Sequence, residues 1–297
     1  MIKTILDTKE ILQQLANLEL RKYPYDEVNE LIRKLGKYAC TETTIPVGTR
    51  IVRARVNCNF EVFSNKTELS YKPAKYNETY QRASTPYTTM FYGVVTPDNI
   101  KNEKIDWSQC IAAYEVSRLL KDDSISEGVQ TITFGKWITT KAIPIIPVVY
   151  NFENFIDSAF AKNLKADFDK DLAGHTVEFL EKTNMITDFF EEQFSKEETT
   201  NDFDYLLSAI YAERITQYKA TPLAGVLYPS VRIKGFKEKG FNIAISSTFA
   251  DNYLRLEKVL ECTWYKKDGQ MTPDNNKLKC VILSEGQSEF ILKLTTK

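Results

Sequence analysis

The sequence has little of what marks several large classes of enzymes. It contains one histidine, His175, and no Gly-x-Ser-x-Gly elbow, so the pattern does not indicate a serine–histidine hydrolase. It also has no Gly-x-x-x-x-Gly-Lys-Ser/Thr loop, no Gly-x-Gly-x-x-Gly after a first strand and no His-Glu-x-x-His. Kinase, P-loop NTPase, Rossmann dehydrogenase and zinc-protease interpretations therefore lose their main support.

Excess charge, long apolar runs and paired cysteines are missing as well. The 297 residues carry 39 basic and 40 acidic side chains, which gives no basic excess for binding nucleic acid. No apolar run reaches the roughly 18 residues of a membrane span, and the acidic residues among the first fifteen argue against a secretory segment. The five cysteines are scattered, without metal-ligand spacing. We expect a cytoplasmic protein with reduced thiols and no metal, nucleic-acid or membrane partner.

The pattern of the remaining residues predicts an α+β fold. Helical spacing marks residues 8–38, interrupted near Pro24, and "IVRARV" and "TTMFYGVV" have the character of strands. "CIAAYEVSRLL" predicts a helix, and "VQTITFGKWITTKAIPIIPVV" two strands broken by Gly135 and Pro144. We expect an N-terminal helical element over 1–45 and a catalytic domain over 46–250. A helical insertion at about 151–200 and a C-terminal β-hairpin extension over 251–297, with a turn at Asp268–Gly269, complete the predicted organisation.

Two arginines are expected to project together from one strand face. In "IVRARV", Val52, Ala54 and Val56 alternate with Arg53 and Arg55. An exposed arginine is ordinary, but two beside a cleft would bind an anion such as phosphate through their guanidinium forks.

Four further residues stand out in their local patterns. Glu115 falls on a largely apolar helix face, where a carboxylate is either paired or functional. Arg82 begins the hydroxyl-rich stretch "RASTPYTTMFYG", whose Tyr92 is either a core ring or a ligand platform. Ser230, after the proline of "YPSVR", marks a strand edge or bend. These readings remain open from the residues alone.

In their order along the chain, these motifs resemble a known family. "IVRARV", "RASTPYTTMFYG", "AAYEVS" and "GVLYPSVR" followed by "FNIAI" resemble the RES domain, named for its Arg, Glu and Ser, over about residues 46–246. The resemblance implies an ADP-ribosyltransferase-like mixed β core with flanking helices. It also implies a toxin of a toxin–antitoxin pair that destroys NAD⁺, with a possible cognate antitoxin as partner.

The resemblance assigns a role to each residue. Arg53 and Arg82 match its arginines, with Arg55 a less certain neighbour, and these side chains would bind the phosphates of NAD⁺ or inorganic phosphate. Tyr92 would stack on the nicotinamide, Glu115 would stabilise the oxocarbenium-like transition state, and Ser230 would position the ribose or the attacking group. On this interpretation Glu115, Ser230 and Arg82 are catalytic, NAD⁺ is a substrate, inorganic phosphate is a possible co-substrate, and no cofactor is needed.

The chain departs from the family pattern at two positions. Gln81 stands where many members have a glycine before the second arginine, and Tyr87 stands near another expected glycine. The acceptor, phosphate or water, therefore remains open. A mono-ADP-ribosyltransferase acting on a protein or nucleotide, and a non-catalytic nucleotide-binding or interaction module, are the alternatives.

Overall fold

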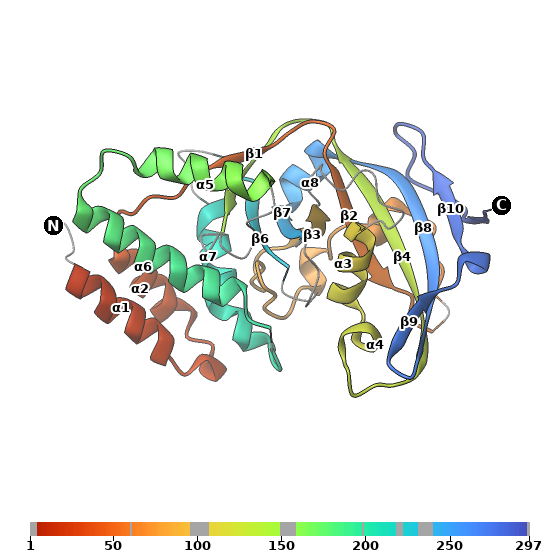
Figure 1. Cartoon of the computed structure of the whole chain (residues 1–297), viewed down its shortest axis with the longest axis horizontal. Helices are drawn as coiled ribbons and strands as arrows, with labels where there is room; N and C mark the ends of the chain where they lie inside the picture. Colours follow the sequence, from red (N-terminus) through yellow and green to blue (C-terminus); the bar gives the residue numbers. More distant parts are fainter. Residues whose placement is uncertain are drawn as a thin grey trace.

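One mixed sheet runs through the molecule, and most of the helices gather at one end of it (Figure 1). This computed structural model describes residues 5–59, 61–95, 107–148, 159–197, 199–217, 222–230 and 240–295. Within these ranges the fold is α+β, as the sequence predicts. The start of the predicted insertion, with Phe152 and Phe155, lies outside the described residues, as do Pro97 and Asp98 after the strand "TTMFYGVV".

The order of the strands places the candidate motifs near the centre of the sheet. Beginning at one edge, the order is β1 (Thr43–Ile45), β5 (Ile143–Pro147), β6 (Gly225–Pro229), β7 (Phe241–Ser246), β3 (Met90–Val95), β2 (Arg50–Val56), β4 (Gly128–Thr139), β8 (Leu254–Lys267), β10 (Lys279–Ile282) and β11 (Lys293–Leu294). β9 (Gln270–Pro273) pairs with β8. β5 and β6 run parallel, whereas the other described pairs are antiparallel.

Five helices form the end of the molecule on the left of Figure 1. They are α1 (Ile5–Asn17), α2 (Tyr25–Leu35), α5 (Ala159–Leu172), α6 (Val177–Phe194) and α7 (Leu206–Thr216). α1 packs against α2 and α6, and α7 packs against α2, α6 and β6. Buried residues of α1, α2, α6 and α7 share one apolar cluster with Met90, Val226 and Ala244 of the sheet. The leading helices and the insertion helices are therefore packed onto the sheet rather than set apart from it.

Shorter helices lie over the remaining parts of the sheet. α3 (Trp107–Val116) packs on β2 and β3, α4 (Arg118–Lys121) on β4, and α8 (Ser247–Tyr253) beside β7. Short 3₁₀ turns complete the secondary structure: η1 (Leu20–Lys22), η2 (Lys66–Leu69), η3 (Ala74–Tyr76), η6 (Asp202–Tyr205) and η7 (Asn275–Lys277). Of these turns, η2 and η3 lie in the polar segment between β2 and β3.

The predicted strand break at Gly135 and Pro144 is wrong. Gly135 lies inside β4, opposite Arg53, and Pro144 lies inside β5, opposite Thr44. A Cβ at Gly135 would lie 2.8 Å from Nε1 of Trp137, so the missing side chain makes room for a core ring instead of ending a strand. The chain turns at residues 140–142 instead.

The predicted hairpin turn at Asp268–Gly269 is confirmed. Both residues have positive φ, 51° and 75°, as a two-residue turn of the I′ type requires, and they join β8 to β9. All five cysteines are free. None of the helices in the described ranges is long and apolar enough to cross a membrane.

Candidate functional site

Three side chains from distant parts of the chain meet at the end of α3. Oε1 of Glu115 accepts a hydrogen bond of 2.8 Å from the Ser230 hydroxyl and one of 2.7 Å from the Asn242 amide. Ser230 and Asn242 are each only 7% exposed, whereas Glu115 is half-buried. Two donors on one oxygen fix the orientation of the carboxylate, so its charge points in a defined direction.

Backbone pairing and close packing bring these three residues together. Ser230 follows β6, and its N–H donates to the carbonyl of Gly240 at 3.0 Å, which places it beside the start of β7. A Cβ at Gly240 would lie 2.3 Å from Cδ1 of Ile111 on α3. The glycine therefore lets α3 approach β7 closely enough for Glu115 to reach Asn242.

Arg53 lies where β2 and β3 separate. The two strands pair at Ile51–Val95 and Val52–Val94, and just beyond these pairs Nη1 of Arg53 donates to the carbonyl of Tyr92 at 2.8 Å. The guanidinium lies 5.5 Å from the centre of the Phe91 ring. Its Nε is buried without a hydrogen-bond partner. Burial lowers the pKa of Arg53 to about 10; Tyr92 acts in the opposite direction, and the charge of Arg55 contributes a smaller lowering.

Arg55 shares this sheet face, as predicted, but its guanidinium is held by a neighbouring segment. Nη1 donates to the carbonyl of Glu68 at 2.8 Å, and Nη2 to the carboxylate of Glu61 at 3.1 Å. The guanidinium also lies over the Phe63 ring, 4.4 Å from its centre. These contacts make Arg55 an anchor for the segment after β2, and its predicted role in binding a substrate stays a prediction.

Arg82 is likewise occupied by backbone carbonyls. It is 9% exposed, donates from Nη1 to the carbonyl of Phe194 and from Nη2 to that of Lys196 at 2.9 Å, and lies over the Tyr205 ring. The guanidinium thus binds the C-terminal end of α6, where carbonyl groups lack helical partners. Arg82 joins its loop to the insertion, and direct contact with phosphate remains a prediction for it.

Tyr92 is fixed by the loop that precedes it. Its hydroxyl accepts a hydrogen bond of 3.0 Å from the N–H of Ala83 and lies 2.7 Å from the Ser84 hydroxyl. Burial raises the pKa of Tyr92 to about 12, although these hydrogen bonds and the charges of Arg53 and Arg82 act in the opposite direction. The phenol therefore stays neutral at physiological pH.

The direct contacts form separate groups, and residues from more than one of them influence the pKa of Tyr228 of β6. Tyr228 lies opposite Asn242 in the sheet and is buried. Burial raises its pKa well above the usual value, Tyr92 and Glu115 raise it further, and Arg82 lowers it. Tyr92, Arg82 and Glu115 therefore lie within electrostatic reach of one side chain.

Arg53 projects from the opposite side of the sheet to Tyr92. Val52 and Val94 belong to the apolar cluster under α3, so Tyr92 projects on the α3 side and Arg53 on the opposite side. Arg53 meets Tyr92 through the backbone carbonyl only. The structure thus unites Glu115 with Ser230 and connects Arg53 to Tyr92, but it does not bring all the predicted side chains onto one face.

Asn242 is a site residue that the sequence reasoning did not single out. It is the one polar residue within "FNIAI", on a strand whose other positions there are apolar. A lone amide on such a strand needs a buried partner, which is the signal that could have found it.

We expect Asn242→Asp to make stability fall as pH rises. The variant places a second carboxyl group beside Glu115, and repulsion between like charges raises the pKa of the new group at position 242 in the folded state. A carboxyl group whose pKa is raised in the folded state stabilises that state at low pH, and this stabilisation is lost as pH increases. The free energy of unfolding should therefore fall by about 1–3 kcal/mol between pH 4 and pH 8 relative to the parent.

Urea unfolding at both pH values measures this difference. Asn163→Asp, at an exposed position of α5, is the control and should show less than about 0.5 kcal/mol. Equal pH dependence in the two variants would show that the carboxylate of Glu115 is not close to position 242.

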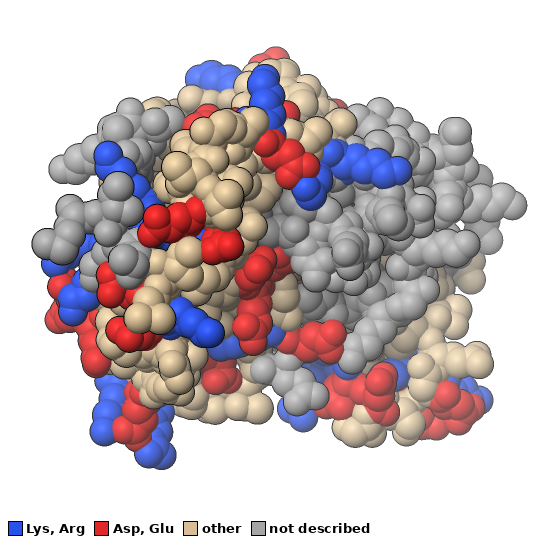
Figure 2. All heavy atoms as spheres, turned by 60° about the vertical axis from the view of Figure 1, so that its left-hand side comes forward, with Lys and Arg blue, Asp and Glu red and all other residues tan. Residues whose placement is uncertain are grey.

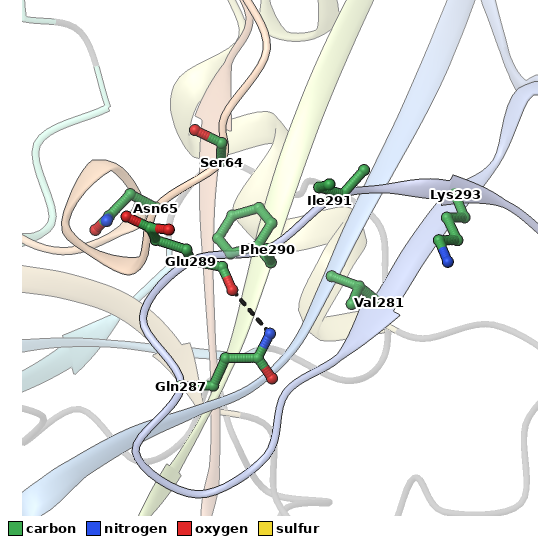
Figure 3. A pocket seen from close by; sticks show the side chains of 8 residues that line it. All are labelled: Ser64, Asn65, Val281, Gln287, Glu289, Phe290, Ile291 and Lys293. Atoms are coloured by element: carbon green, nitrogen blue, oxygen red, sulfur yellow. Dashed lines mark hydrogen bonds between the residues drawn. The ribbon is translucent and has the colours of Figure 1, made fainter.

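A hollow elsewhere on the surface shares no residue with this site. It has a volume of about 630 Å³ and lies between the segment before η2 and the C-terminal strands (Figure 3). Its lining comprises Ser64, Asn65, Val281, Gln287, Glu289, Phe290, Ile291 and Lys293. Gln287 is held to the Glu289 carbonyl, and the hollow has no arranged acid and hydroxyl comparable to Glu115 and Ser230 among these residues. We therefore locate the candidate site by its chemistry and not by this hollow.

The charged side chains in the described part of the helical end are mixed in sign. Figure 2 shows Lys and Arg interspersed with Asp and Glu over this face. This distribution offers no single-sign patch among the coloured residues.

Comparisons with known proteins found no relative. No family model matches the chain, and searches of curated proteins and of solved structures also returned no match.

Proposed function

We propose that the protein is a RES-type enzyme that cleaves the bond between nicotinamide and ribose in NAD⁺. The observation that carries the proposal is the Glu115 carboxylate oriented by Ser230 and Asn242. A fixed carboxylate is suited to stabilise the positive charge that develops on the ribose as a glycosidic bond breaks. The resemblance of the ordered motifs supplies NAD⁺ as the substrate.

The proposed reaction transfers ADP-ribose to an oxygen acceptor. The bond between C1′ of the ribose and N1 of nicotinamide breaks, and its electron pair stays on nicotinamide, which neutralises the pyridinium charge. An oxygen of phosphate or water forms the new bond to C1′. Phosphate gives ADP-ribose 1-phosphate, whereas water gives ADP-ribose and one released proton. Ser230 and Asn242 would hold Glu115, and the Ser230 hydroxyl would orient the ribose or the acceptor.

Arg53 is the proposed anion ligand. Of the three arginines, Arg53 is the one whose Nε is buried without a hydrogen-bond partner. Within the described residues, no carboxylate lies beside its guanidinium. Arg53 is half-buried, and a cation partly removed from water without an anion is costly, so phosphate bound there would relieve that cost. Arg53 and Tyr92 project on opposite sides of the sheet, so the phosphates would reach Arg53 where β2 and β3 separate, and Tyr92 would cover the nicotinamide on the α3 side.

Incubation of the purified protein with NAD⁺, with and without inorganic phosphate, tests the proposal. We expect nicotinamide release in at least one condition, and separation of ADP-ribose 1-phosphate from ADP-ribose identifies the acceptor. Labelled NAD⁺ added to cell extract tests transfer to a macromolecule. A protein that releases no nicotinamide and labels no macromolecule would contradict the proposed function and favour a binding module.

A biological role follows from the resemblance alone. We propose that the protein acts in the cytoplasm as a toxin whose cognate antitoxin blocks the site, since RES family members act in such pairs.

A further inference from the structure

A buried carboxylate outside the proposed site connects the helical end to the "RASTPYTTMFYG" loop. Glu213 of α7 is 2% exposed. Its Oε2 accepts a hydrogen bond of 2.6 Å from the hydroxyl of Tyr25, the first residue of α2. Its Oε1 accepts one of 2.8 Å from the hydroxyl of Thr85. One buried carboxylate therefore accepts hydrogen bonds from the hydroxyl groups of two segments that are far apart in sequence.

Thr85 is the centre of the loop's own hydrogen bonds. Its hydroxyl also accepts the N–H of Tyr87 at 3.3 Å, and its N–H donates to the hydroxyl of Thr88 at 3.2 Å. The amide of Asn77 donates to the carbonyls of Thr85 and Thr88 at 2.7 and 2.8 Å. Holding Thr85 therefore fixes the course of the chain on both sides of it.

The same loop holds Tyr92 through residues next to Thr85. Ala83 and Ser84 bind the Tyr92 hydroxyl, and the Tyr92 carbonyl binds Arg53. If Thr85 moved, Ser84 would move with it and would displace Tyr92. Tyr92 is the side chain that we propose to cover nicotinamide. Glu115 belongs to α3 and is oriented from β7 and the end of β6, so this shift would leave it in place.

Because no cation pairs with Glu213 within the described residues, its contacts favour a role in positioning neighbouring segments over a role in an ion pair. Within the described residues no lysine or arginine pairs with this carboxylate. Burial of an acid satisfied by hydroxyl groups adds little net stability, but the short bonds allow little positional freedom. We propose that Glu213 is a positioning residue of the site, which holds the Thr85 loop to α2 and so sets the place of Tyr92. This inference rests on the proposed function for its effect on catalysis.

Three variants that each remove one part of the connection test it: Glu213→Gln, Tyr25→Phe and Thr85→Val. We expect amide hydrogen exchange over residues 80–90 to become about tenfold faster in each, because each loses about one hydrogen bond to a charged group. The KM for NAD⁺ should rise about tenfold while kcat changes less than twofold. General loss of folded protein would instead lower kcat and leave KM unchanged.

Tyr71→Phe is the matched control. Tyr71 also donates to a carboxylate, that of Asp251, at 2.7 Å, but belongs to a different apolar cluster. We expect unchanged exchange over 80–90 and unchanged KM in this variant. If the exchange rates of the three test variants equal those of the parent, Glu213 does not hold the loop. If exchange increases and KM does not, the loop does not position the substrate. If the parent itself cleaves no NAD⁺, the proposed function fails, and exchange alone decides whether Glu213 fixes the loop.

Discussion

Glu115→Gln should reduce nicotinamide release by about 10²–10³-fold. Glutamine has nearly the shape of glutamate and can still accept a hydrogen bond from Ser230 or Asn242, so the local fold should persist. The variant removes the negative charge that we propose to stabilise the oxocarbenium-like transition state, and electrostatic groups of this kind are commonly worth 10²–10³ in rate. The loss should appear in kcat, with little change in KM.

Steady-state assays of NAD⁺ cleavage measure this effect. Glu127→Gln removes a charge from an exposed glutamate and should keep parental activity. Ser230→Ala should lose less than Glu115→Gln, since Asn242 would still orient the carboxylate. Activity within threefold of the parent in Glu115→Gln would remove Glu115 from the mechanism, whatever the identity of the substrate.

Arg53→Met should abolish the binding of phosphate-containing ligands without lowering the stability of the free protein. Burial holds the pKa of Arg53 down to about 10, so the folded state disfavours the charged form and carries an electrostatic cost at neutral pH. Methionine fills similar space without that cost. The cost to the parent decreases as pH rises from about 10 toward the ordinary pKa of arginine, so any advantage of the variant should shrink above pH 10.

Thermal unfolding with and without NAD⁺ or inorganic phosphate measures both effects. We expect ligand to raise the Tm of the parent and not that of the variant, because only a ligand that binds the folded state stabilises it. Arg118→Met, at a highly exposed arginine of α4, should respond to ligand as the parent does. A variant that unfolds well below the parent without ligand would show that the Tyr92 carbonyl and the Phe91 ring compensate the charge of Arg53.

The sequence predicts the local elements well because their signals are local. The alternation in "IVRARV" correctly places Arg53 and Arg55 on one face of β2, since the side-chain period of a strand depends on neighbouring residues only. The Asp268–Gly269 turn is predicted for the same reason. The break expected at Gly135 fails because the reason for that glycine is the Trp137 ring packed beside it, which the local pattern does not reveal.

The partners of the candidate residues could not be predicted, because they come from distant segments. Arg82 finds the carbonyl of Phe194, 112 residues away, through the packing of α6 against the sheet. Nothing within "RASTPYTTMFYG" indicates that contact. The Asn242 partner of Glu115 depends on the register of β7 with β3 and β6, which the residues around Glu115 do not indicate.

The distance along the chain between Glu115 and its partners has a consequence for synthesis of the protein. Ser230 lies 115 residues after Glu115, and Asn242 lies 127 residues after it. At about 5–20 residues per second, a ribosome needs on the order of 6–25 s to add that length of chain. A nascent polypeptide therefore contains Glu115 several seconds before it contains Ser230 and Asn242, which orient the carboxylate. On the proposed function, NAD⁺ cleavage would begin only after Asn242 has been added, which leaves that interval before the site can form.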